Sequence, residues 1–262
     1  MRTTLHTRRH ALSVLTAATV GGSLLLTGAP ALAWQMFGGK TVNPSGRVKV
    51  EARTVDAFHA VSVNIPGSVE LIQGGSESLQ LEADDNLLPV IETVVENGEL
   101  QIRITQGVQL TGSSRIRVTV RAASVDSLAV AGSANLLANR LQTTRLEASI
   151  AGSGNITIRD LQSERLSVSI AGSGDFEARG AGQAIDVSIA GSGHLRAPNF
   201  STQSAKVSIA GSGNATVWVR KSLSVSIVGS GDVRYYGEGA LQGASVIGSG
   251  RIRSLGGAPP AA

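Results

Sequence analysis

Seven polar residues stand at nearly regular intervals in the second half of the chain, each directly after a glycine-rich triplet. They carry amide, carboxylate, imidazole and guanidinium groups, which donate and accept hydrogen bonds. A straight row of such groups suits a linear partner, so we interpret it as a ligand-binding ladder for a polysaccharide or another envelope component. A second interpretation is that the stacked side chains satisfy one another and the turn backbone. The members of this polar ladder are Asn135, Asn155, Asp175, His194, Asn214, Asp232 and Arg251.

Three carboxylates in one stretch, Asp175, Glu177 and Asp186, raise the alternative of a polysaccharide-degrading β-helix enzyme. Paired carboxylates serve as acid and base in glycoside hydrolysis. Sugar-binding sites usually offer aromatic rings, however, and aromatic residues make up only 3% of this chain. We therefore predict that the protein is not an enzyme and has no catalytic residues.

Motifs for cofactors and metals are missing from the sequence. The two histidines beyond residue 33, His59 and His194, have no zinc-type spacing, and the chain has no cysteine. The glycine-rich triplets lack the Lys-Ser/Thr pair of a phosphate-binding loop, and calcium-binding β-rolls repeat at about nine residues. We predict neither a cofactor nor a metal ion.

The ladder residues follow a repeated unit that must position them. Glycine-rich triplets, mostly Gly-Ser-Gly, begin at seven positions whose spacings are 20, 20, 19, 20, 18 and 19 residues. Runs with alternating apolar and polar residues stand before and after each triplet, which predicts β-strands with one buried face. The first glycines of these triplets are Gly132, Gly152, Gly172, Gly191, Gly211, Gly229 and Gly248.

Two apolar columns give the direction of the strands. The residues two places before and four places after each first glycine are apolar in all seven units, from Val130 and Leu136 to Val246 and Ile252. One such unit cannot bury its apolar face alone, whereas stacked units form a continuous core. Identical columns at a nearly constant period favour parallel stacking over an antiparallel meander. We predict an all-β fold, a single right-handed parallel β-helix with about 20 residues per coil.

The region from 46 to 130 has strand-like alternation without the triplets. It either continues the β-helix with less regular coils or forms a small antiparallel sheet on its end, for which Asn97-Gly98 is a good turn signal. Near the other end, we expect Tyr235, Tyr236, Arg251 and Arg253 to cap the last coils against edge-to-edge association.

A column of serines should lie outward, three places before each first glycine. Together with a neighbouring column of alanines it predicts a flat face of small side chains, through which the chain could also self-associate. The oligomeric state is left open. The serines are Ser149, Ser169, Ser188, Ser208, Ser226 and Ser245.

The first 33 residues have the layout of a cleavable secretion signal, with three arginines, an apolar run and Ala31-Leu32-Ala33. Arg8-Arg9 leaves both the general and the twin-arginine export routes open, and a retained anchor is the alternative to cleavage. We predict a signal peptide at 1–33, a linker at 34–46, the β-helix domain at 47–255 and a flexible tail at 256–262. The mature protein would be exported, periplasmic or extracellular, without a stable membrane span.

Charge argues against nucleic acid as a partner. The predicted signal peptide holds three of the 23 basic residues and no acidic residue, which leaves 20 basic against 19 acidic residues. A nucleic-acid-binding protein usually carries a basic patch or stripe. The near-neutral mature chain therefore predicts no nucleic-acid binding.

The order of these features resembles the auto-transporter adhesin family with a head GIN domain. The resemblance is carried by Phe58, Val61-Ser62-Val63, Asp84-Asp85-Asn86-Leu87-Leu88, Asn97-Gly98-Glu99-Leu100, the Gly-Ser-Gly series and Tyr235-Tyr236-Gly237, and it spans roughly residues 48 to 255. It implies a β-helix in the envelope or outside the cell, with no established activity. A non-enzymatic, adhesin-like binding or structural protein is the function that follows.

Overall fold

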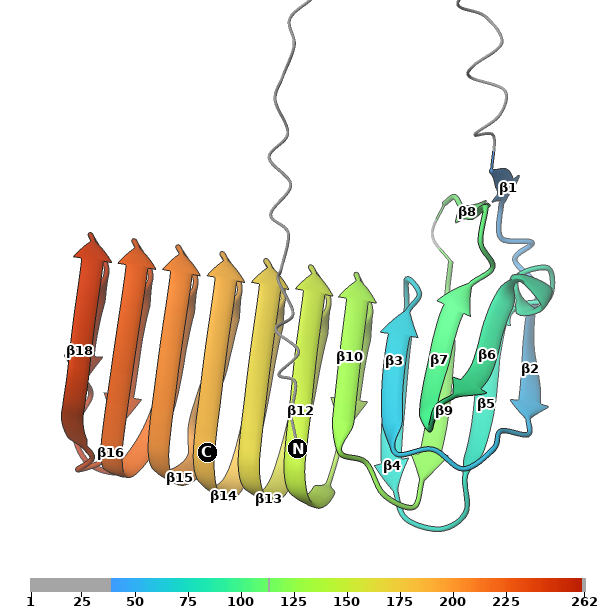
Figure 1. Cartoon of the computed structure of the whole chain (residues 1–262). Coiled ribbons are helices and arrows are strands. Elements are labelled where there is room, and N and C mark those ends of the chain that lie inside the picture. Colours follow the sequence, from blue (N-terminus) through green and yellow to red (C-terminus); the bar gives the residue numbers. More distant parts are fainter. Residues whose placement is uncertain (1–38, 113, 261–262) are drawn as a thin grey trace, which may run out of the picture. The chain divides into compact units, whose positions relative to one another are not determined.

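The computed structural model describes residues 39–112 and 114–260 (Figure 1). The predicted signal peptide at 1–33 lies outside the described residues. The described chain is almost entirely β-structure, with one short 3-10 turn, η2 (Leu88–Val90).

A parallel β-helix forms the C-terminal part of the molecule, as the repeat predicts. Successive coils pair in parallel with the predicted columns in register, for example Ile150 with Ile170 and Asn135 with Asn155. In Figure 1 the chain rises along the near face, descends along the far face and advances away from the N-terminal strands, so the winding is right-handed. The strands are β10 (Ser127–Gly132), β11 (Asn135–Ala138), β12 (Leu141–Gly152), β13 (Asn155–Gly172), β14 (Asp175–Gly191), β15 (His194–Gly211), β16 (Asn214–Gly229), β17 (Asp232–Tyr236), β18 (Ala240–Gly248) and β19 (Arg251–Ser254).

Each coil has three outward sides, which β13 illustrates. Residues 155–158 form the first side, which starts with a ladder residue and is called the ladder face. Residues 161–163 form a short second side, called the bend side. Residues 165–171 form the third side, called the serine face because Ser169 lies in its middle. Some residues within these ranges, such as Leu161 and Leu166, point inward and are fully buried.

The N-terminal part combines the two arrangements that the sequence left open. Strands β3 (Ala60–Asn64) and β7 (Glu99–Ile104) extend the serine face in parallel, and β4 (Ser68–Gln73) and β9 (Arg117–Ala122) extend the ladder face. Strands β2 (Val48–Arg53), β5 (Ser78–Asp84) and β6 (Ile91–Glu96) pair antiparallel at the end. A separate parallel pair joins β1 (Lys40–Val42) to β8 (Val108–Leu110).

The apolar columns build a narrow core of aliphatic side chains with two phenylalanines, Phe176 and Phe200. Both predicted columns are buried in the first six coils that contain the triplet. In the last coil Val246 is 40% exposed and Ile252 is only partly buried. These two residues point inward like their counterparts, but no further coil of the described chain covers them.

The first glycine of each triplet turns the chain at the corner between the serine face and the ladder face. Gly191 has φ = +123°, a region that side chains other than glycine rarely adopt. A Cβ atom on Gly191 would also lie 2.4 Å from the carbonyl oxygen of Gly172 in the coil before it. Conformation and close stacking both therefore require glycine here.

The two ends of the described β-helix differ. At the N-terminal end the Arg53 guanidinium donates hydrogen bonds to the carbonyl oxygens of Ile91 (2.6 Å) and Leu88 (2.8 Å), which closes the end with a charged side chain. At the C-terminal end every residue of β18 is exposed. Tyr235 packs against the core and its backbone pairs with Ser254, whereas Arg251 and Arg253 are exposed. Of the four predicted capping residues, Tyr235 is the one that fills the core.

Candidate functional site

The polar ladder forms the row that the sequence predicts. Its seven residues lie in register across consecutive strands, each at the start of the ladder face. Ser68 and Arg117 continue the row toward the N-terminal end, because Ser68 pairs with Asn135 and with Arg117. Both residues lie before the first triplet, so the repeat gave no signal for them.

Asn155 links three coils through its side-chain amide. Its Oδ1 accepts a hydrogen bond from the Asp175 backbone N–H at 3.0 Å, so its Nδ2 must point the other way. That Nδ2 donates to Asn135 Oδ1 at 2.7 Å. The chain of bonds is therefore polarised, and it leaves the Nδ2 group of Asn135 as a donor toward solvent.

A second polarised chain has the same direction. Asn214 Oδ1 accepts from the Asp232 backbone N–H at 3.0 Å, which places its Nδ2 3.2 Å from His194 Nδ1. Since this Nδ2 is a donor, His194 Nδ1 must accept, and the imidazole carries its proton on Nε2. Asp232 Oδ1 accepts in turn from the Arg251 backbone N–H at 3.1 Å. These bonds give several ladder residues a structural role at the corner.

Asp175 departs from this pattern. Its Oδ2 accepts a hydrogen bond from Arg196 Nη1 at 2.6 Å, but its Oδ1 is buried without a hydrogen-bond partner, the one such side-chain atom in the described residues. The His194 backbone N–H donates to Gly174 instead. A buried carboxylate oxygen without a partner is uncommon in folded proteins and marks a place that a donor can occupy.

A groove of about 640 Å³ lies on the ladder face around Asp175. Asn135, Asn155 and Asp175 line it, whereas His194, Asn214, Asp232 and Arg251 lie outside. The groove crosses six strands, in the order β9, β4, β11, β13, β14 and β15. Its charged lining residues are Glu70, Arg117, Arg159, Asp175, Glu177 and Arg196.

Four groove residues that the sequence analysis did not single out lie in the column two places after the ladder. They are Glu70, Leu137, Thr157 and Arg196, and they are in register with Glu177. The period of two within a strand places this column on the same face as the ladder. This alternation of outward and inward residues is the sequence signal that could have identified them.

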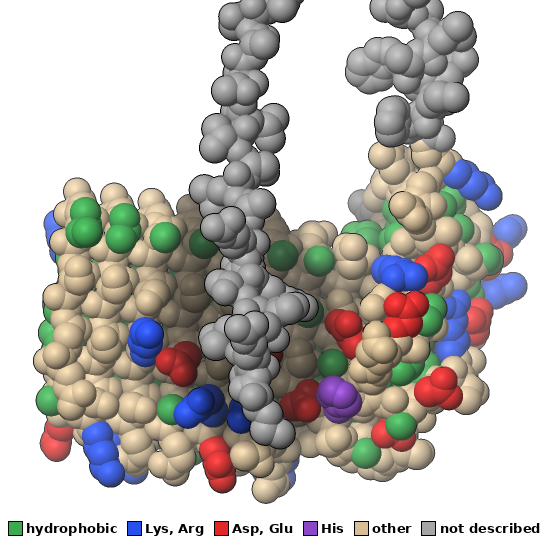
Figure 2. All heavy atoms as spheres, in the orientation of Figure 1, with side chains coloured by type: hydrophobic (Ala, Val, Ile, Leu, Met, Phe, Trp, Pro, Cys, Tyr) green, Lys and Arg blue, Asp and Glu red, His purple; other side chains and the backbone are tan. Residues whose placement is uncertain are grey.

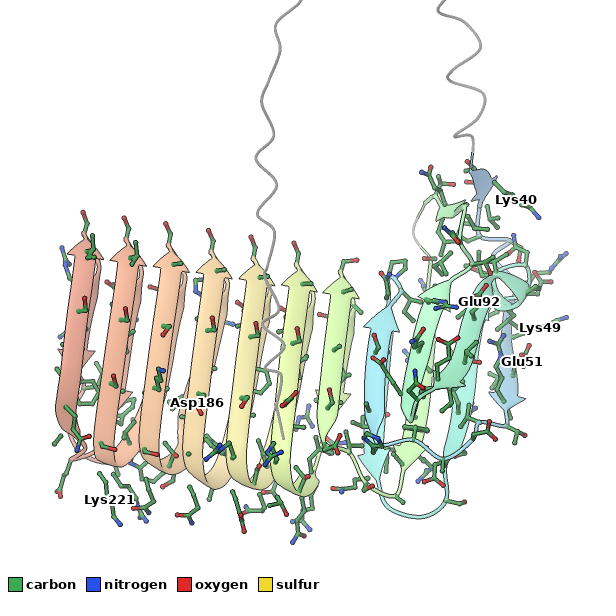
Figure 3. All side chains as sticks on the ribbon, in the orientation of Figure 1. Lys40, Lys49, Glu51, Glu92, Asp186 and Lys221 are labelled. Atoms are coloured by element: carbon green, nitrogen blue, oxygen red, sulfur yellow. The ribbon has the colours of Figure 1, made fainter. Side chains whose placement is uncertain are left out.

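The three candidate catalytic carboxylates do not meet. Asp175 and Glu177 line the ladder-face groove, whereas Asp186 pairs with Ser167 and Lys206 on the serine face of the same coil. Figure 3 shows Asp186 on the near face. The buried Ile185 and Val187 flank it, so its side chain points away from the core and from the other two. An acid and base pair that includes Asp186 is thereby excluded.

The predicted serine column is in register on the serine face, from Ser149 to Ser245. The neighbouring alanine column ends in Val228 and Ile247, which are 52% and 65% exposed. Figure 2 shows this face with few charged side chains over the later coils, whereas charged groups gather over the N-terminal strands. Self-association through this face stays a prediction, which the sedimentation mass of the purified protein would test.

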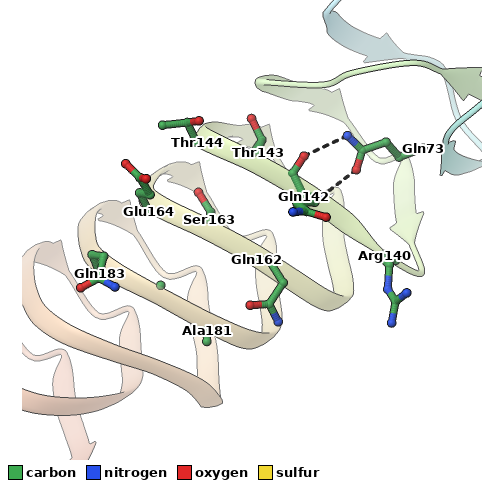
Figure 4. Close-up of a pocket in the computed structure, with 11 residues that line it drawn as sticks. Gln73, Arg140, Gln142, Thr143, Thr144, Gln162, Ser163, Glu164, Ala181 and Gln183 are labelled. Atoms are coloured by element: carbon green, nitrogen blue, oxygen red, sulfur yellow. Dashed lines mark hydrogen bonds between the residues drawn. The ribbon is translucent and has the colours of Figure 1, made fainter.

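A second groove, of about 780 Å³, lies on the bend side of three consecutive coils (Figure 4). At one end, the Gln73 carboxamide pairs with the backbone of Gln142: Nε2 donates to the carbonyl oxygen at 2.9 Å, and Oε1 accepts from the N–H at 2.7 Å. Gln73 thus replaces the neighbouring strand that this edge lacks. The lining is mainly amide and hydroxyl groups, including Gln162, Gln183 and Ser163.

The described residues contain no group of three or more His, Asp and Glu side chains arranged to hold a metal ion. His59 Nδ1 lies 2.9 Å from Asp126 Oδ1 at an exposed position. Residues 39–112 and 114–260 also include no helix with the length and apolar character that crossing a bilayer requires.

Three bacterial proteins of known structure share this fold. A putative adhesin from Bacteroides fragilis has a TM-score of 0.77 at 23% identity, over 82% of this chain and 100% of that one. A putative lipid binding protein from Parabacteroides distasonis has a TM-score of 0.69 at 24% identity, over 82% and 100%. A putative adhesin from Parabacteroides merdae has a TM-score of 0.68 at 23% identity, over 82% and 99%.

No curated protein matches this chain. A family model described as "Putative auto-transporter adhesin, head GIN domain" matches residues 57–239, which include the ladder face, the bend side and nearly all of the coils. The resemblance in the sequence motifs is thereby confirmed. The chain belongs to the family that this model describes, the head GIN domain family.

Proposed function

We propose that the protein is an exported, non-enzymatic, adhesin-like protein that binds a polar polymer of the cell envelope in the ladder-face groove. The observation that carries this proposal is the groove itself, whose polar groups come from six strands in register. Parallel coils repeat such groups about every 4.8 Å. A polymer that crosses the coils would therefore meet donors and acceptors at regular steps.

The charges in the groove indicate the kind of polymer. Arg117, Arg159 and Arg196 stand against Glu70, Asp175 and Glu177, so the two signs balance. A strongly anionic chain would meet repulsion from the carboxylates. A polymer with hydroxyl and amide groups together with both charges fits better, because it can pair with carboxylates and guanidinium groups alike. Cell-wall peptidoglycan has this chemistry.

The non-enzymatic part of the proposal is supported by how the groove carboxylates are held. Asp175 is paired with Arg196, and Glu177 lies 3.4 Å from Arg179. A general acid needs a raised pKa and a position free to transfer its proton. Carboxylate oxygens that already face guanidinium groups are placed for ionic binding rather than for proton transfer to a substrate.

Obstruction of the groove should abolish binding while the fold persists. Thr157 lies two residues after Asn155 in the groove, and Ser169 lies on the serine face of the same coil. We expect Thr157→Arg to lower retention on insoluble peptidoglycan about tenfold or more, because the long side chain fills the groove. Ser169→Arg adds the same side chain to the opposite face and should leave retention unchanged.

Co-sedimentation with purified peptidoglycan measures both variants, and circular dichroism checks their fold. Equal retention of the Thr157→Arg and wild-type proteins would exclude the groove as the binding site.

Export has its own test. The predicted signal peptide ends at Ala33, so the mature protein should begin at Trp34. Expression of the full chain in a bacterial host, followed by fractionation and intact-mass measurement, should give a periplasmic or secreted species that lacks residues 1–33. A species in the cytoplasm that retains Met1 and Arg2 would contradict export.

A further inference from the structure

One outward column on the bend side changes its chemistry along the molecule. Register places Gln142 beside Gln162, and the column continues through Ala181 and Ser201. It ends in aromatic residues, because Ser201 pairs with Trp218 and Trp218 pairs with Tyr236. This bend column therefore has amides at one end, small residues in the middle and two aromatic rings at the other end.

The amide end is preorganised. Gln162 Nε2 donates to Asp160 Oδ1 at 3.2 Å, and Arg140 Nε donates to Asp160 Oδ2 at 2.8 Å. These two hydrogen bonds hold the pKa of Asp160 below its ordinary value, and the bond from Gln162 has the larger effect. The carboxylate therefore stays charged and keeps both partners in place. The Gln162 oxygen is left as an acceptor in the bend-side groove (Figure 4).

The middle of the bend column is hollow because the coil of β14 has small residues at the bend. Ala181 and Gly182 replace the Gln162 and Ser163 of the coil before it. Both residues line the 780 Å³ groove, and Ala181 pairs with Ser201 in the next coil. A chain-like ligand that crosses the coils therefore meets little side-chain bulk at Ala181 and Gly182.

The aromatic end has the features of a stacking platform. Trp218 and Tyr236 are outward and partly exposed, and Trp218 Cδ1 lies against Gly237, where a Cβ atom would approach to 3.1 Å. Arg220 lies 5.9 Å from the centre of the Trp218 ring. A pocket of about 260 Å³ beside the ring is also lined by Arg220 and Glu238. The indole ring offers a large flat apolar surface, and the charged side chains of Arg220 and Glu238 beside it can hydrogen-bond hydroxyl groups.

We propose that the bend column is a binding track for an uncharged glycan chain, separate from the ladder-face groove. Sugar hydroxyls would pair with the Gln142 and Gln162 amides, and the C–H face of a sugar ring would lie on Trp218. Five coil steps of about 4.8 Å give a track of about 24 Å, which accommodates an oligosaccharide rather than a single sugar. The groove lining is mainly uncharged, and this favours a neutral glycan over a polyanion.

Tryptophan fluorescence gives a direct test. The sequence has two tryptophans, Trp34 and Trp218, so a Trp34→Phe full-length protein reports on Trp218 alone. Titration with cellohexaose, chitohexaose and mannohexaose should shift the Trp218 emission for at least one of them. Trp218→Ala should weaken the affinity for that sugar, measured by calorimetry, by about tenfold, and Gln162→Ala should weaken it by about threefold.

Matched variants separate loss of the track from loss of the fold. Trp218→Phe keeps a ring and should recover most of the affinity. Gln80→Ala removes an exposed glutamine of β5 that lines none of these grooves, and it should change nothing. Thr157→Arg should also leave this affinity unchanged, which distinguishes the track from the ladder-face groove. The proposal is overturned if none of the three sugars binds the wild-type chain, or if binding leaves Trp218 emission and the Trp218→Ala affinity unaltered.

Discussion

Replacement of Gly191 by alanine should destabilise the β-helix by more than about 3 kcal/mol. The alanine must adopt φ = +123°, and its Cβ atom would lie 2.4 Å from the Gly172 carbonyl oxygen. That oxygen accepts hydrogen bonds from the N–H groups of Ser192 and Gly193, at 2.9 and 3.0 Å, so it cannot move without breaking the corner. Urea unfolding followed by circular dichroism would measure the loss.

Gly243→Ala is the matched control for this substitution. Gly243 lies inside β18, and a Cβ atom there meets only Ser224 Oγ, at 3.4 Å. Alanine is favoured over glycine within a strand by about 0.5 kcal/mol, so this variant should be as stable as the wild type or slightly more stable. Equal midpoints for Gly191→Ala and Gly243→Ala would show that the corner tolerates a side chain.

Phe176→Ala should cost about 3–5 kcal/mol of unfolding free energy. Phe176 is fully buried and stacks between Ile156 and Leu195 in the column that follows each corner. The coils on both sides are fixed by continuous backbone pairing, so they cannot collapse into the space that the ring leaves. The cost should therefore include both lost burial and a residual cavity.

Two further variants check the cause of that loss. Phe176→Leu keeps most of the volume and should cost less than half as much. Val228→Ala removes apolar atoms from a side chain that is 52% exposed and should stay within about 0.5 kcal/mol of the wild type. A thermal unfolding series would compare all three, and a Phe176→Ala midpoint close to that of Val228→Ala would contradict a rigid core at this position.

The sequence allowed the regular coils to be predicted because one period fixes three properties together. The spacing of the glycines places the corners. The alternate positions of apolar residues such as Ile170 identify the inward face, and the near-constant period indicates parallel stacking. The N-terminal half could not be predicted in the same way. Strands such as β5 and β7 have the same alternation, and alternation does not distinguish parallel from antiparallel partners.

The candidate sites were predictable in part. The ladder could be placed because every member follows a triplet, but its hydrogen bonds depend on details such as the orientation of the Asn214 amide. The bend side was missed because its length varies from coil to coil. Register shifts there between Ala197 and Ser201 bring Ser201 beside Trp218, and no fixed period relates these two residues. The distribution of binding groups on the bend side therefore required the structure.

The uncovered last coil has a consequence for how such a molecule can change in length. Leu241 and Val246 have the positions of the core residues Leu223 and Ile227 in the coil before them, so a further coil would find a ready surface on which to fold. Duplication of one 20-residue unit would lengthen the molecule by about 4.8 Å and leave every earlier contact intact. The number of repeats would therefore set the length of the β-helix, and with it the length of polymer that the β-helix can contact.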